Sequence, residues 1–191
     1  MNLTRITYRT RQFWRYLGAA PSQSDIIKIY AILTPRQFAL FSRMHKTEQF
    51  HSLEVLRGLV KAGETDRDLL VAALLHDSGK VLQTLRLWER VWVVLVKAFF
   101  PRKANSWGEA GEGSMNLHVN PSLQQSMLPW WKKPFLTARQ HPAWGANLAE
   151  EAGASAASVA LIRRHQENVV GPPVTQEDVL LRKLQDMDET N

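Results

Sequence analysis

Residues 69–80, with the sequence LLVAALLHDSGK, decide the fold that the chain is expected to adopt. The first seven of these residues are small or aliphatic and include no Pro or Gly, which predicts a helix buried on nearly all sides. Thr65 and Asp66 offer side chains for the helix N-cap, and Gly79 is a typical helix stop. The helix therefore carries two titratable side chains, His76 and Asp77, into the protein interior.

This buried His-Asp pair requires partners, because burying an unpaired polar group costs several kcal/mol. One interpretation is structural: His76 is a core histidine satisfied by hydrogen bonds, and Asp77 caps the next turn. The other is chemical: the two side chains bind a metal ion or act on a substrate. The remaining histidines and acids of the chain distinguish these interpretations.

Composition narrows the chemistry that the chain can support. Its 191 residues are 45% hydrophobic, which is ordinary for a globular protein, so one well-buried domain is expected. The 24 basic and 18 acidic side chains give a net charge of +6, which favours anionic partners such as nucleotides, phosphates or an acidic membrane surface. Because cysteine is absent, any metal must be bound by His, Asp or Glu, the ligands that suit Mn, Fe, Mg, Co or Zn.

Two expectations concern the location of the protein. No run of about eighteen apolar residues occurs, so no membrane-spanning helix is predicted. The N-terminal residues lack the apolar core of a signal peptide, so the protein is expected to be cytoplasmic.

Apolar side chains recur with helical spacing along most of the chain, and no strand signal or repeat is found in the sequence. An all-α fold is therefore predicted, in the form of a helical bundle with a short N-terminal helical arm. The expected helices cover residues 24–33, 34–62, 66–79, 81–100, 137–151, 155–167 and 179–188.

Some segments call for a separate interpretation. Residues 1–33 form a basic arm with interspersed aromatic side chains, for which packing on its own domain is favoured over contact with nucleic acid or an anionic membrane surface. Residues 34–191 form the main domain, which the Pro-, Gly- and Trp-rich residues 101–134 interrupt as a long irregular loop. The apolar stretch 92–100 is interpreted as core or inter-subunit packing, with an active-site cover or a lipid interface as alternatives.

Most of the six histidines lie on or at the end of strongly apolar helices. These are His51, His76, His141 and His165. Their separations of 25, 65 and 24 residues exclude a local metal loop, so they share a site only if a helical bundle brings distant helices together. Asp188, at the end of the last predicted helix, is a further candidate ligand, with Asp186 as its competitor.

The order His…His-Asp…His…His…Asp, together with its local context, resembles the HD-domain metallophosphohydrolase superfamily. The resemblance runs from about Phe50 to the end, roughly three-quarters of the chain, and implies an HD-type helical domain. The matching motifs are His51-Ser52, Ala73-Leu74-Leu75-His76-Asp77-Ser78-Gly79-Lys80, His141-Pro142 with Gly145, His165 with Glu167, and Met187-Asp188.

The resemblance also implies a set of metal ligands like that of the two-metal branch of the superfamily. One divalent ion would be bound by four residues and a second by three, with one carboxylate shared: His51, His76, Asp77 and Asp188, then Asp77, His141 and His165. Two such ions activate water as hydroxide and clamp a phosphoryl group for in-line attack.

The chain is accordingly expected to be a metal-dependent phosphohydrolase that uses a metal-bound hydroxide. Its expected substrate is a small, nucleotide-derived phosphomonoester, phosphodiester or anhydride. Asp77 and Lys80 are the expected catalytic residues; Lys80 either contacts phosphate oxygens or complements the dipole of the preceding helix. Glu54, Arg90 and Arg164 are further candidates for assisting roles.

Other functions stay open beside this one. The main alternative is an HD-like module that senses a nucleotide or scaffolds a partner without turnover, and another is nucleic-acid binding through the N-terminal arginines. Hydrolysis of cyclic dinucleotides is disfavoured, because that branch has a doubled His before Glu and then Gly-Tyr-Pro. This chain has His165-Gln166-Glu167 followed by Gly171-Pro172-Pro173.

Overall fold

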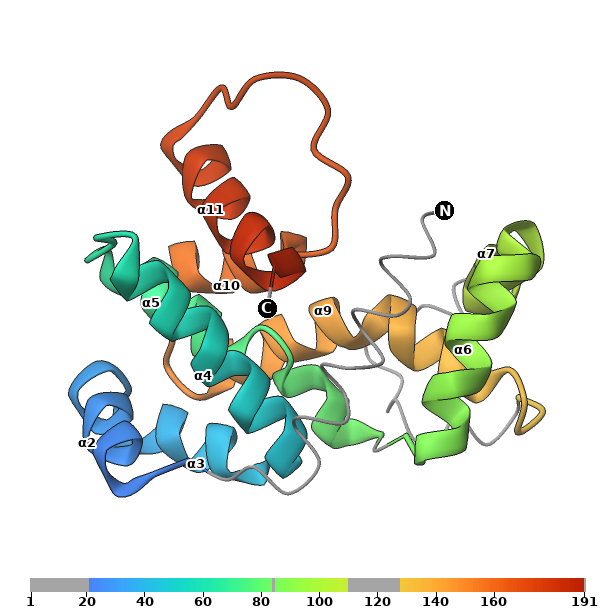
Figure 1. Ribbon diagram of the computed structural model, residues 1–191, viewed down its shortest axis with the longest axis horizontal. Helices are drawn as coiled ribbons and strands as arrows, with labels where there is room; N and C mark the ends of the chain where they lie inside the picture. Colours follow the sequence, from blue (N-terminus) through green and yellow to red (C-terminus); the bar gives the residue numbers. More distant parts are fainter. Residues whose placement is uncertain (1–20, 84, 110–127, 191) are drawn as a thin grey trace. The chain divides into compact units, whose positions relative to one another are not determined.

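The computed structural model describes residues 21–83, 85–109 and 128–190, and all regular secondary structure in these ranges is helical (Figure 1). This confirms the predicted all-α fold class. The helices are α2 (Gln23–Ile32), α3 (Pro35–Arg43), α4 (Lys46–Lys61), α5 (Arg67–Leu75), the 3₁₀ helix η1 (Ser78–Leu82), α6 (Leu87–Phe99), α7 (Pro101–Glu109), α9 (Lys133–Glu151), α10 (Ala156–Arg164) and α11 (Gln176–Thr190). None of these described helices has the length and hydropathy needed to cross a bilayer.

The chain folds into two compact units, each of which is described by itself. Unit 1 comprises residues 1–79 and 142–191, and unit 2 comprises residues 80–141. α2, which the sequence assigns to the N-terminal arm, packs against α3 and α5 within unit 1. The arginines of residues 1–20 and the central part of the predicted loop, 110–127 with His118, lie outside the described residues.

Unit 1 is organised around α5, which contacts α2, α3, α4, α10 and α11. The side chains of Leu69 and of residues 71–75 are at most 4% exposed, as the unbroken apolar run predicts. Asp66 accepts a hydrogen bond from the backbone N–H of Leu69 and so caps the helix as expected. The C-terminal end of α5 consequently emerges inside the protein rather than in water.

Two helix boundaries predicted for unit 1 are wrong. The single helix expected over residues 34–62 is divided into α3 and α4, because Met44 and His45 are extended and His45 accepts a hydrogen bond from the N–H of Thr47 as a new N-cap. Gly79 does not stop α5, which ends at Leu75 and is followed by η1. There the ring Nδ1 of His76 donates to the Ala73 carbonyl, which occupies an acceptor of the last turn.

Unit 2 contains α6, α7 and the first part of α9, around a core of Val93, Val96, Ala104 and Phe135. The prediction of an irregular loop over residues 101–134 is wrong for 101–109, which form α7, and for 133–134, which begin α9. Pro101 occupies the first position of α7, where proline favours the start of a helix. The apolar face of α7 is short, Ala104 and Trp107, so its stability comes from packing against α6 and Phe135 rather than from a pattern visible in the sequence.

An ion pair between α2 and α4 joins two helices of unit 1. The carboxylate of Asp25 accepts hydrogen bonds from the backbone of Ser22, which forms the α2 capping box, and from the guanidinium of Arg57, with an Nη2–Oδ1 distance of 2.7 Å. Burial raises the pKa of Asp25, but the hydrogen bonds from Ser22 and Arg57 outweigh it and lower that pKa from 3.8 to about 2.

Asp25→Asn should therefore destabilise the protein in a pH-dependent way. A carboxyl whose pKa is depressed on folding stabilises the native state above its unfolded pKa, and this contribution disappears as the pH falls from about 4 to about 2. Because Arg57 is partly exposed, we expect a loss of about 1–2 kcal/mol at pH 7 and a smaller loss at about pH 2.5. Urea unfolding at several pH values measures it. Asp186→Asn, at an exposed position of α11, is the control, and an equal loss at both pH values would contradict the assignment.

Candidate metal centre

Five of the six predicted ligand residues belong to unit 1, and its helices bring them together from four places in the chain. His51 lies on α4, His76 and Asp77 follow α5, His165 follows α10, and Asp188 lies in the last turns of α11. His76, Asp77 and His165 are at most 4% exposed. The sequence separations of these residues are therefore bridged by helix packing.

Four of these residues form a cluster of potential ligand atoms. His51, His76 and Asp77 offer atoms that all lie within 4.8 Å of one another. His76 Nε2 lies 3.6 Å from an oxygen of Asp77 and 3.6 Å from Asp188 Oδ1, which is 2.7 Å from His51 Nε2. Two ligands of one ion bound at about 2.0–2.2 Å are about 3–4.4 Å apart, so the 3.6 Å separations suit a shared cation. The 2.7 Å contact is a direct hydrogen bond that an ion would replace.

Backbone carbonyls orient the imidazoles of His76 and His165. Each ring donates from Nδ1 to the carbonyl three residues earlier, Ala73 O at 2.9 Å and Ile162 O at 2.7 Å. The ends of α5 and α10 leave such carbonyls without helical partners, so the histidines cap their own helices. Since Nδ1 carries the proton, Nε2 keeps its lone pair, and the rings of His51 and His165 lie 5.3 and 5.2 Å from that of His76.

His76 Nε2 is the atom that best tests whether a metal fits. The residue is 1% exposed, and among the described residues this nitrogen has no hydrogen-bond partner. Leaving a buried polar atom in that condition costs about 1–3 kcal/mol. A cation between the neutral imidazoles and the carboxylates would satisfy it, and nitrogen with carboxylate oxygen is a donor set for borderline or hard divalent ions. The residues present fit a divalent metal.

Asp188 is held ionised by its neighbours. Burial raises the pKa of this carboxyl, but the hydrogen bond from His51 outweighs it and keeps that pKa well below its usual range. The structure thus brings Asp188 to the histidines, whereas the competing Asp186 is exposed on another side of α11. An anionic carboxylate at this place is the form that binds a cation.

Asp77 and His165 define a second place for an ion beside the first. Their ligand atoms lie within 4.8 Å of each other. His141, the remaining predicted ligand, is the last residue of unit 2 and lies within α9. Its Nδ1 donates to Thr137 O at 3.1 Å, and helix geometry puts the residue on the face of α9 that carries Gly145. Its participation in the cluster stays a prediction.

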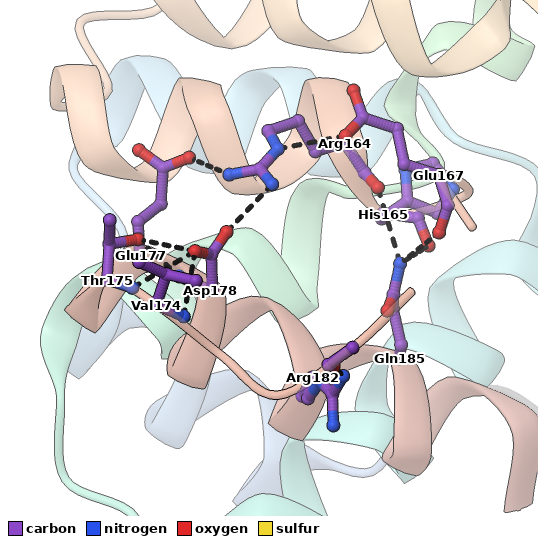
Figure 2. Close-up of polar contacts among 10 residues, drawn as sticks. Arg164, His165, Glu167, Val174, Thr175, Glu177, Asp178, Arg182 and Gln185 are labelled. Atoms are coloured by element: carbon purple, nitrogen blue, oxygen red, sulfur yellow. Dashed lines mark hydrogen bonds and ion pairs between the residues drawn. The ribbon is translucent and has the colours of Figure 1, made fainter. Parts of the chain in front are cut away.

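A set of ion pairs fixes α11, and hence Asp188, against α10 (Figure 2). Arg164, the last residue of α10, binds Glu177 and Asp178 in the first turn of α11 and Glu167 beyond its own helix. The hydrogen bond from Arg164, followed by those from Thr175, lowers the pKa of Asp178 to about 2. The sequence suggested an assisting role for Arg164; the structure engages its guanidinium with three carboxylates.

Gln185 continues this connection one helical segment nearer to Asp188. Its amide nitrogen donates to the carbonyls of His165 at 3.1 Å and of Glu167 at 2.8 Å, so it holds the segment that presents the His165 ring (Figure 2). Sequence reasoning missed this residue. No local pattern marks a glutamine whose partners are backbone carbonyls about twenty residues away.

Arg164→Met should loosen α11 while Arg163→Met should not. Arg163 is the neighbouring arginine, is exposed and has Asn147 as its hydrogen-bond partner, so the pair of variants makes the same chemical change. We expect amide hydrogen exchange in α11 to become about tenfold faster in Arg164→Met, because the ion pairs oppose local opening of the helix. Exchange measured by mass spectrometry reports it, and equal rates in both variants would refute the positioning role.

The backbone of α9 at Gly145 touches the His-Asp turn directly. Ser78 Oγ donates to Gly145 O at 3.4 Å, and a Cβ at position 145 would lie 3.0 Å from Gly79 N and 3.1 Å from Ser78 Oγ. The close atoms are mainly backbone and a buried hydroxyl, which cannot move aside as a flexible side-chain end does. Only glycine lets α9 approach the turn after Asp77 this closely.

Gly145→Ala should consequently destabilise the protein despite the better helix propensity of alanine. Propensity favours the substitution by about 0.5–1 kcal/mol, and overpacking opposes it by about 1–3 kcal/mol. We expect a net loss of about 1 kcal/mol in the free energy of unfolding, measured by denaturant titration. Glu150→Ala, on the exposed side of the same helix, should be neutral or stabilising. A stabilised Gly145→Ala variant would show that the turn after Asp77 shifts to accommodate the added methyl group.

The other residues suggested by the sequence lie as follows. Lys80 belongs to η1, begins unit 2 and is half-buried. Glu54 forms an ion pair with Arg57, which occupies the carboxylate that was a candidate for ordering water or a histidine. Arg90 lies on α6, and its side chain is outside the described part of the structure.

Comparison of the chain with protein-family models, curated proteins and solved structures finds no match. The arguments for function therefore rest on the residues and their geometry.

Proposed function

We propose that this protein is a metal-dependent phosphohydrolase that acts on a small, nucleotide-derived phosphomonoester, phosphodiester or anhydride. One observation carries the proposal. His51, His76 and Asp77 offer ligand atoms within 4.8 Å of one another inside unit 1, Asp188 lies 3.6 Å from His76 Nε2, and this buried nitrogen has no hydrogen bond within the described residues. A purely structural histidine would have that nitrogen satisfied.

Two divalent ions are proposed, with Asp77 shared between them. The first would be held by His51, His76, Asp77 and Asp188, and the second by Asp77, His165 and His141. Such ions, when bound, polarise phosphoryl oxygens and make water acidic enough to attack phosphorus at neutral pH.

The chain's own residues prepare the site for this chemistry. The carbonyls of Ala73 and Ile162 accept the Nδ1 protons of His76 and His165. These hydrogen bonds hold each ring in one orientation, with its Nε2 toward the cluster. Asp188 stays anionic at neutral pH, which offsets the charge of a bound cation. Lys80, three residues after Asp77, would supply a positive charge to phosphate oxygens.

The proposed substrate class follows from the proposed ions, because phosphate esters and anhydrides are the anions on which paired divalent ions act. Nucleotides are small molecules that carry such esters and anhydrides.

The test combines metal analysis with activity. Protein purified without a chelating tag should contain about two equivalents of divalent metal, and EDTA should abolish hydrolysis of aryl phosphates and of a nucleotide panel. His76→Ala and Asp77→Ala should each lose metal and at least about 100-fold in kcat/KM, because they remove ligands rather than their supports. His45→Asn is the matched control, since it removes an exposed imidazole outside the cluster and keeps an N-cap acceptor for α4.

Two outcomes would reject the proposal in different ways. Full turnover in Asp77→Ala would show that the cluster is not the reaction centre. Metal bound by the cluster with no product from any phosphate ester or anhydride would instead support the sensing or scaffolding module.

A further inference from the structure

α6 has two apolar faces, and one of them is exposed. Val93 and Val96 pack into the core of unit 2, as a helix of a globular domain is expected to do. The other face, here called the α6 stripe, also repeats with helical spacing and consists of Trp88, Val91, Trp92, Leu95 and Phe99. Phe99 is 73% exposed and Trp88 47%, so these side chains lie in water rather than against the core. Water-exposed apolar surface of this extent marks an interaction site.

The apolar surface of unit 2 extends beyond α6. Phe100, between α6 and α7, is 56% exposed, and Trp130 is 63% exposed with its ring 5.4 Å from that of Trp88. α6 and α7 contact each other, and they meet through the core face of α6. The α6 stripe is therefore left on the surface by the same packing that buries Val93 and Val96.

Positive charge collects in the same unit. Residues 80–141 contain nine lysines or arginines against three acids, a net charge of +6, and the rest of the chain carries fifteen of each. The whole net charge of the chain thus belongs to unit 2. Lys103 Nζ lies 5.5 Å from the ring centre of Phe100, and Lys132 Nζ lies 5.0 Å from that of Trp131. Glu89, the acid on α6 itself, accepts a hydrogen bond from the backbone of Arg86 at the start of the helix.

We propose that unit 2 docks on an anionic lipid surface, with the α6 stripe, Phe100 and Trp130 inserted at the level of the headgroups and the surrounding cations on the lipid phosphates. Aliphatic, aromatic and basic side chains combined on one short helix are the composition of an interfacial helix. α6 has 13 residues, about 20 Å, and none of the described helices can span a bilayer, so the unit would lie on the membrane rather than cross it.

Charge argues against the other apolar occupant, a second copy of the chain. A symmetric dimer through the α6 stripe would bring two surfaces of net charge +6 together, which is unfavourable. Nucleic acid would use the cations and the aromatic rings, but it offers nothing to the aliphatic Val91 and Leu95. An anionic bilayer offers partners to both the apolar and the basic side chains of unit 2. The proposed docking does not depend on the proposed phosphohydrolase activity.

The experiment is vesicle flotation of the purified protein. Vesicles of phosphatidylcholine with about one-third phosphatidylglycerol should bind it at least about tenfold more tightly than phosphatidylcholine alone, and the binding should weaken as salt is raised. Leu95→Glu and Phe99→Glu should each reduce binding about tenfold or more, because each replaces an inserted apolar side chain with an anion. Val174→Glu is the matched control, since it makes the same change of charge at an apolar residue of unit 1 that is more exposed than either, and it should leave binding unchanged.

Bromine-labelled phosphatidylcholine mixed with phosphatidylglycerol gives a second readout. It should quench tryptophan fluorescence in the wild type and in Val174→Glu but not in Phe99→Glu, and circular dichroism checks that each variant is folded. Equal binding to neutral and anionic vesicles, or no binding to either, would overturn the proposal. So would a dimer that Leu95→Glu dissociates, or RNA binding without vesicle binding.

Discussion

The burial of His76 and Asp77 at the end of α5 is the constraint on which unit 1 depends. α5 is enclosed by helices on all sides, so its last residues face other side chains rather than water. Polar groups in such a place need partners, and α4 and α11 bring His51 and Asp188 beside His76, whose Nε2 the proposed cation would satisfy. The carbonyl of Ala73 accepts the Nδ1 proton of His76, so one imidazole completes its own helix and points at the cluster. The helix packing that buries α5 thus also brings the candidate metal ligands together.

The two units use charge differently. In unit 1, where acids and bases balance, basic side chains hold helices together: Arg57 binds Asp25, Arg164 binds three carboxylates, and Lys183 binds Glu64. In unit 2, acids are scarce and cations lie beside aromatic rings. Charge that is neutralised internally stabilises a fold, whereas unneutralised charge creates a field that attracts partners. The chemistry proposed for unit 1 and the docking proposed for unit 2 are therefore separable properties of one chain.

The fold could be predicted from the sequence as far as it depends on local periodicity. Apolar spacing indicated most helices and the burial of Leu69 and residues 71–75, because these are properties of neighbouring side chains. Boundaries set by other contacts were predicted wrongly. The break between α3 and α4 depends on a cap from His45, and α7 depends on packing of Ala104 against Val93, Val96 and Phe135. Such contacts have no signature within the segment that they stabilise.

The candidate site shows the same division more sharply. The sequence by itself determined which residue types were available, because the chain is all-helical, lacks cysteine and carries most of its histidines on or at the end of apolar helices. It therefore named the candidate ligands. Between Asp186 and Asp188 it offered only the spacing of a motif, because both lie in the same helix with similar neighbours. Residues two apart on a helix differ in direction by about 200°, so only one of them can meet His51. In the tertiary structure Asp188 is the residue that contacts His51. The reason is that the contacts of Arg164 and Gln185 fix the orientation of α11 against α10, and this orientation determines which face of α11 points inward.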